Sequence, residues 1–127
     1  MGAYALRFNS SGAGNSAMGR EALFYNTTGS YNSAIGTGAL LNNTTGSSNS
    51  AMGLDAGRYL ADGSTANQTS NNSFFLGANT RANGAGQTNQ IVIGASAIGL
   101  GSNTVVLGNS SITTTRLQGN ILSLIHI

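Results

Sequence analysis

A sequence repeat with a period of about 17 residues is the feature that most constrains the fold of this chain. The motif NSAMG, with one change of Met to Ile, stands at 15–19, 32–36 and 49–53. A polar turn of the form NSSG or NTTG keeps the same spacing ahead of each copy. A unit of this length cannot bury its apolar side alone, whereas stacked copies bury one continuous core. The spacing therefore predicts a solenoid of stacked coils.

The second half of the chain keeps the pattern with more apolar letters. The later copies are NSFFLG at 72–77, NQIVIG at 89–94 and NTVVLG at 103–108. The first of them follows NSAMG at 49–53 by one period plus seven residues, the second by one period, and the third by a shorter interval. We expect a solenoid over 1–120, with early repeats at 1–65, an insertion at 66–72 and late strands at 73–120. The repeat glycines are Gly19, Gly36, Gly53, Gly77, Gly94 and Gly108.

Each unit combines a short apolar run ending in glycine with a polar turn rich in Asn, Thr and Gly. Asn and Gly tolerate the left-handed backbone that tight turns need. Strands that recur once per coil stack in parallel and in register. The predicted fold class is all-β, a parallel β-solenoid like a left-handed β-roll, with repeats of about 14–17 residues. The segments at 20–26 and 54–60 carry helix formers and predict short helical turns in the early repeats.

One slot, directly before each repeat glycine, always holds a large apolar residue. We expect that slot to point into the core, and it contains Met18, Ile35, Met52, Leu76, Ile93 and Leu107. The two preceding slots hold Ser and Ala in the early strands and larger apolar residues in the late ones. Strands that are apolar on both faces are buried on both faces. A thin solenoid has only one inside, so the pattern predicts a homo-oligomer, expected to be a homotrimer. The candidate interface residues are Phe74, Phe75, Ile91, Val92, Val105 and Val106.

Composition excludes several classes of function. Only 6% of the residues are charged, and the five arginines are scattered singly, so no basic stripe predicts nucleic-acid binding. The chain has no Cys or Lys, which leaves no thiolate metal site and no phosphate-binding P-loop. No apolar run reaches the roughly 20 residues of a membrane span, so membrane insertion is not expected. We predict no cofactor and no metal.

Catalysis needs positioned acids, bases or nucleophiles, and these are scarce. The only acids are Glu21, Asp55 and Asp62, and the middle repeat has none in the segment after its glycine. A glycosidase requires two carboxylates at a set separation. The only histidine, His126, lies at the extreme C-terminal end. We therefore predict no catalytic residue and no enzyme.

The tyrosines are the remaining candidates for binding. Tyr4, Tyr25, Tyr31 and Tyr59 are able to stack on sugars, but packing between coils or chains is the favoured interpretation, because buried aromatic area is the more usual stabiliser. Ice binding through paired threonines is disfavoured, because the Thr-Thr pairs align only at 27–28 and 44–45.

The repeat resembles two known families of fibrous proteins. Its strand motif is similar to the head repeats of trimeric autotransporter adhesins. With the following Ala-Leu and NTTG elements, it is still more similar to the repeats of bacteriophage tail fibres, over roughly residues 1–120. The segment at 105–120 resembles the one that precedes the endosialidase-type intramolecular chaperone of such fibres. The 127 residues contain no such chaperone, so self-cleavage is not assigned.

The resemblance implies a structural and adhesive fibre segment that recognises the host surface. Its implied partners are other copies of itself, as a homotrimer, and a bacterial surface glycan or protein receptor. Its implied location is the tail of a virion. The alternative is the head of a bacterial trimeric adhesin at the cell surface. The resemblance does not identify the receptor.

Both ends of the chain depart from the repeat. The sequence LSLIHI at 122–127 is what results from translating the end of a common sequencing-transposon adapter, and we interpret 121–127 as an artefact of sequencing. Met1 occupies the slot of Met18, so we expect the repeat to extend upstream.

Overall fold

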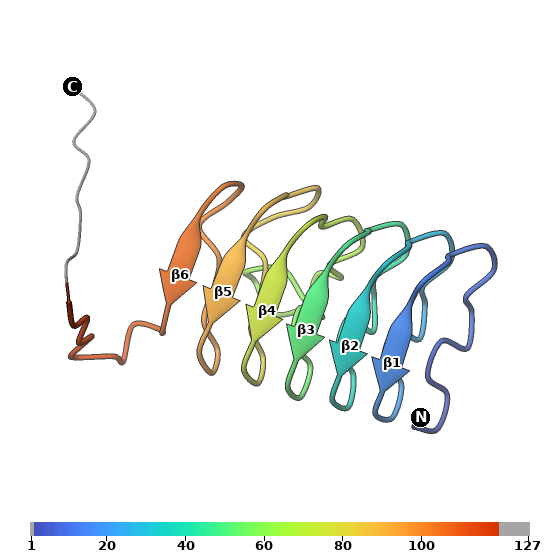
Figure 1. Cartoon of the computed structure of the whole chain (residues 1–127), viewed down its shortest axis with the longest axis horizontal. Coiled ribbons are helices and arrows are strands. Elements are labelled where there is room, and N and C mark those ends of the chain that lie inside the picture. The colour runs from blue at the N-terminus through green and yellow to red at the C-terminus, as the bar shows by residue number, and fades with distance from the viewer. Residues whose placement is uncertain (1, 120–127) are drawn as a thin grey trace.

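The computed structural model describes residues 2–119 and shows a parallel β-solenoid (Figure 1). Residues 110–119 are exposed and leave the stacked coils, so the solenoid ends before the expected residue 120. Its strands are β1 (Ser16–Met18), β2 (Ser33–Ile35), β3 (Ser50–Met52), β4 (Phe74–Leu76), β5 (Ile91–Ile93) and β6 (Val105–Leu107). They form one sheet in the order β1 to β6, and each strand pairs in parallel with the next. The register follows the repeat, with Ala34 beside Ala17 and Ala51. The predicted all-β solenoid is confirmed.

The segments that follow the early strands form no helix, so the expected helical turns at 20–26 and 54–60 are wrong. Glu21 and Leu23 have φ angles of 59° and 51°, which a right-handed helix does not accept. The backbone instead alternates its partners. The Ala22 N–H donates within its own coil to Gly19, whereas the Leu23 N–H donates to Ala39 of the next coil at 3.0 Å. Hydrogen bonding between coils therefore replaces helix formation.

The inward side of each strand is its middle residue. Ala34, Phe75 and Val92 are fully buried in the solenoid core. The residues directly before the repeat glycines lie on the opposite face, which corrects their prediction as core. Met18, Ile35, Met52 and Leu107 are exposed, and Leu76 and Ile93 are half-buried. Successive side chains of a strand alternate between its two faces, so choosing the larger residue as the inward one selected the wrong face.

Facing segments explain why the inward strand residues are so small in the early coils. Leu23 and Leu40 come from the far side of the coil and are fully buried, so alanines such as Ala34 suffice opposite them. The equivalent position one coil later is Gly57, where an added Cβ would lie 2.8 Å from the ring of Phe75. The ring of Phe75 therefore occupies the space that a third leucine would need. The interior stays close-packed because a large residue on the strand side faces a small one on the far side, and the reverse.

The repeat glycines form a column in which neighbouring backbones touch. A Cβ placed on Gly36 would lie 2.5 Å from the carbonyl oxygen of Gly53. The φ angle of Gly36 is 127°, a region that L-residues rarely adopt. Both the close approach and the backbone conformation require glycine there.

Asparagines form ladders that run along the solenoid. Asn32 is fully buried, and its side chain donates to the Gly46 carbonyl at 2.8 Å. Its Oδ1 accepts from the backbone N–H of Asn49 at 2.9 Å, and Asn32 in turn donates to Asn15. A parallel ladder joins Asn43 to Asn26. These asparagines recur in every early coil because they satisfy buried backbone groups, and none of them has a positive φ.

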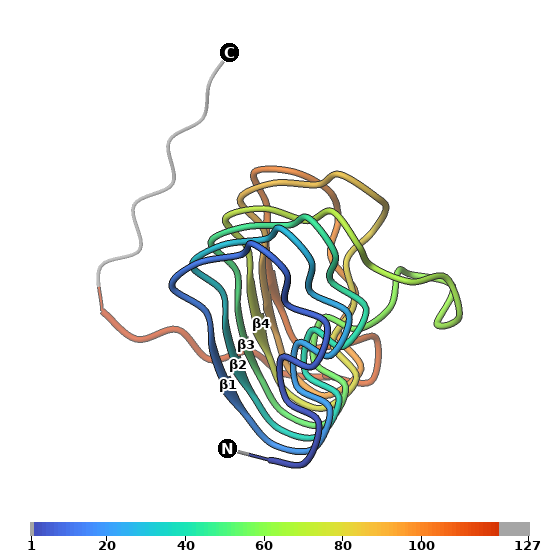
Figure 2. The same cartoon turned by 90° about the vertical axis from the view of Figure 1, so that its right-hand side faces the viewer.

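The insertion begins before the expected 66–72. Asn42 still donates to the Arg58 carbonyl, 16 residues on, whereas the N–H and the hydroxyl of Thr44 donate to the Gln68 carbonyl, 24 residues on. The extra residues are therefore 60–66, and an antiparallel bridge between Tyr59 and Ala66 closes them into an excursion. Figure 2 shows this excursion in yellow-green, projecting from the stacked coils. Met1 and the proposed artefact at 121–127 lie outside the described residues.

Candidate functional site

The outward face of the sheet is an unusually apolar surface. In the early strands it alternates serines with large residues such as Met18, which is 60% exposed. In the late strands both outward columns are apolar, as with Phe74 and Leu76 of β4. None of the outward strand residues is charged. A contiguous apolar surface of this kind is typical of an interaction site.

The six candidate interface residues divide between the two faces of the sheet. Phe75 and Val92 are fully buried in the solenoid core, so they are unable to contact another chain, whereas Val106 of the last strand packs against the core and is half-buried. Their neighbours Phe74, Ile91 and Val105 point outward and are exposed. The outward face also contains the residues that the sequence predicted for the core, from Met18 in β1 to Leu107 in β6. The sheet thus has an outward apolar face, but only Phe74, Ile91 and Val105 of the predicted interface residues belong to it.

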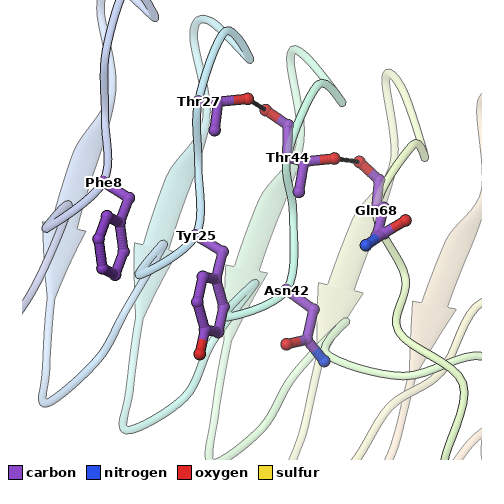
Figure 3. Close-up of a pocket in the computed structure, with 6 residues that line it drawn as sticks. All are labelled: Phe8, Tyr25, Thr27, Asn42, Thr44 and Gln68. Carbon is purple, nitrogen blue, oxygen red and sulfur yellow. Dashed lines mark hydrogen bonds between the residues drawn. The ribbon is translucent and has the colours of Figure 1, made fainter.

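A pocket of about 440 Å³ lies on another side of the coils, where two repeat positions meet (Figure 3). The first position holds Phe8, Tyr25 and Asn42, each one repeat period after the one before. The second position runs alongside it and holds Thr27, Thr44 and Gln68. In Figure 3 the strands lie behind the backbone that carries these side chains. The pocket is therefore separate from the apolar face of the sheet.

The aromatic side of this pocket is a stack of rings. Phe8 and Tyr25 are parallel within 4°, with centroids 5.7 Å apart, and both are about half exposed. Phe24 meets each of them edge to face, at 5.1 and 4.7 Å. The Arg7 guanidinium lies 5.7 Å from the centroid of Phe8. These contacts hold the two rings in place from several directions.

The polar side of the pocket is neutral and partly unpaired. The hydroxyl of Thr27 donates to the Thr44 carbonyl at 2.9 Å, and that of Thr44 donates to the Gln68 carbonyl at 3.3 Å. Asn42 Nδ2 donates to the Arg58 carbonyl, which leaves its Oδ1 facing no partner among residues 2–119. The exposed side-chain amide of Gln68 likewise makes no hydrogen bond within the described residues. Donors and acceptors are thus open to a ligand.

Three of the four tyrosines singled out in the sequence lie near one another, since Tyr4 and Tyr25 both meet Phe24 and Tyr25 and Tyr59 line one hollow. Tyr25 belongs to the pocket, and Tyr4 meets Phe24 edge to face at 6.4 Å. Tyr31 is 70% exposed and lies against Gly14, and the Arg58 guanidinium lies over Tyr59. Packing between coils accounts for Tyr25 only in part, since about half of it remains exposed.

Sequence reasoning missed Phe8, Asn42, Thr44 and Gln68 as neighbours of Tyr25. The signal was available for Phe8 and Asn42, because both stand one repeat away from Tyr25. It was hidden for Gln68, because the displaced insertion moved that residue out of register with Thr44.

The acids are engaged in local contacts. Glu21 and Asp55 are equivalent positions two coils apart, and they pair with Arg20 at 3.3 Å and Arg58 at 2.9 Å. Asp62, in the excursion, accepts hydrogen bonds from Ser64 and Thr65, which lower the pKa of its carboxyl to about 2, with the side chain of Thr65 as the largest cause. Residues 2–119 contain no cluster of three or more side chains that could hold a metal ion.

The fold and these surfaces define a β-solenoid repeat protein with one apolar sheet face and one aromatic pocket. Comparison of the chain with protein-family models, with curated proteins and with solved structures gives no match. Within the described residues no helix is long and apolar enough to cross a membrane.

Proposed function

We propose that this chain is a structural and adhesive segment of a homotrimeric fibre of the bacteriophage tail-fibre type, which recognises a bacterial surface. The observation that carries the proposal is the outward face of β1 to β6. It continues over all six strands, lacks charge, and becomes apolar in both columns from β4 onward. Left in water, such a face is an aggregation hazard, and covering it with the same face of other copies removes the hazard.

The stacked coils support a mechanical role. The backbone of each coil bonds to its neighbours, and the glycine column and asparagine ladders repeat those links along the axis. Each coil contacts mainly the coil before and the coil after it, so the array extends without a change of design. The three-fold stoichiometry rests on the resemblance to trimeric fibres. The complete reading frame distinguishes a tail fibre from a bacterial adhesin head, since only the latter continues into a membrane anchor.

Sedimentation velocity over a range of concentrations tests the self-association. We expect the purified chain to sediment as a trimer, and the variant Ile91→Asp to sediment as a monomer with unchanged β circular dichroism. An unpaired charge buried in an interface costs about 3–5 kcal/mol. Thr28→Asp places the same charge on an exposed turn and should leave the trimer intact. A wild-type chain that stays monomeric at tens of micromolar would overturn the proposal.

A further inference from the structure

The two aromatic rings of the pocket end abruptly at Asn42. Phe8 covers one face of Tyr25, and the column continues on the other side with the much smaller Asn42 (Figure 3). The second face of Tyr25 is therefore directed toward the open pocket. A flat ligand in the Asn42 coil would continue the stack begun by Phe8 and Tyr25.

We propose that this pocket binds a neutral pyranose residue of a bacterial surface glycan. The inference rests on the proposed function and names the ligand class and the place on the fibre where it binds. One face of a pyranose ring presents C–H groups that suit an aromatic ring, and its hydroxyls both donate and accept hydrogen bonds. The pocket offers a matching set, with an aromatic wall on one side and the free amide of Gln68 and the Oδ1 of Asn42 on the other. Apolar walls with a few placed polar groups are the usual form of small-ligand sites.

The charge of the pocket decides between sugar classes. None of its six lining residues is an aspartate, glutamate, histidine, lysine or arginine. An acidic sugar would find no cation among them, and Arg7 lies against Tyr4 and Phe8. The pocket therefore favours a neutral hexose or N-acetylhexosamine over an acidic sugar.

A second hollow extends the site along the surface. It has a volume of about 320 Å³, shares Tyr25 and Asn42 with the first, and adds Tyr59 together with Glu21 and Arg58, whose charges are of opposite sign. A ligand longer than one sugar is able to occupy both hollows. We therefore expect oligosaccharides to bind more tightly than the monosaccharide.

The pocket remains accessible in the proposed trimer. The strand face that would be buried between chains carries β2, whereas Asn42 follows on a different side of the same coil. Self-association through the strand face thus leaves the glycan pocket on the outer surface of the fibre.

An array of immobilised neutral oligosaccharides, with sialylated and sulfated counterparts, tests the proposal on the full chain. We expect binding to a subset of the neutral glycans. Tyr25→Ala should weaken it about tenfold through loss of the stacking face, and Gln68→Ala about fivefold through loss of hydrogen bonds. Tyr25→Phe keeps the ring and should therefore retain the binding, which shows that the loss in Tyr25→Ala comes from the missing ring. Tyr31→Ala removes an exposed tyrosine elsewhere and is the matched control.

Several results would overturn the proposal. These are a wild-type chain that binds no neutral glycan, a preference for the acidic counterparts, and a Tyr25→Ala variant that binds as well as the wild type. Equal affinity for a tryptophan-containing peptide would assign the pocket to a protein receptor instead. Sedimentation of Tyr25→Ala separates the two proposals. We expect that variant to remain trimeric, so a failed pocket leaves the fibre standing and a failed trimer leaves the pocket standing.

Discussion

Phe74 and Phe75 are adjacent phenylalanines of one strand, and truncating each in turn tests the assignment of the two faces. Phe75 is fully buried against Gly57 and Leu40, whereas Phe74 is 36% exposed on the outward face. Burying a phenylalanine side chain contributes about 1.5–3 kcal/mol, and the cavity left by truncation raises the cost of Phe75→Ala to about 3–5 kcal/mol. Phe74→Ala leaves no cavity in the solenoid, and in a single chain it should cost on the order of 1 kcal/mol.

Thermal unfolding followed by circular dichroism at several protein concentrations measures both effects. The loss from Phe75→Ala should be on the order of 10 °C or more and should not vary with concentration. The loss from Phe74→Ala should grow with concentration, because binding between copies stabilises the folded state by mass action. If Phe75→Ala abolishes folding, Phe75→Leu provides a smaller cavity and the same comparison. Equal losses in the two alanine variants at low concentration would refute the inward assignment of Phe75.

Three further predictions test the ladders and the excursion. Gly29→Ala should destabilise the chain strongly, because its Cβ would lie 2.3 Å from the Gly46 carbonyl oxygen, whereas Gly84→Ala, with 3.7 Å to its nearest neighbour, should be nearly neutral in the same melts. Asn32→Ala should cost about 1–3 kcal/mol for each buried backbone group left unpaired, and faster amide exchange at Asn49 would be its signature. The Asp62 carboxylate should keep its hydrogen bonds at and below pH 3.8, the ordinary pKa of an aspartate, and lose them only as the pH falls through its lowered pKa of about 2. A midpoint near 4 in the pH dependence of the Thr65 amide shift would contradict this.

The period of the repeat was enough to predict the fold class, because spacing alone fixes how coils stack. Gly36 and its equivalents stand at the repeat spacing in the sequence, and their column in the structure requires both close approach and positive φ. The helical turns failed because helix propensity at Glu21 and Leu23 is weak compared with hydrogen bonds between coils. Local propensity was overridden by the repeat itself.

The direction of the strand side chains was not predictable from hydrophobicity. A strand with one buried face alternates apolar and polar residues, and the larger apolar residue then marks the core. Here the inward residue is small in β2 because Leu23 and Leu40 fill the interior from the far side, and large in β4 because Gly57 does not. Only knowledge of the facing segment decides which residue of the strand points inward.

The candidate binding site arises where the repeat is broken. Phe8 and Tyr25 begin a column that the repeat would continue with a third ring, but Asn42 stands there and leaves one face of Tyr25 open. Gln68 reaches the same place only because the extra residues at 60–66 leave the coil and return to it in register with Thr44. In this chain the regular positions hold the backbone rigid, and the departures from them create the space and the unpaired polar groups that recognition requires.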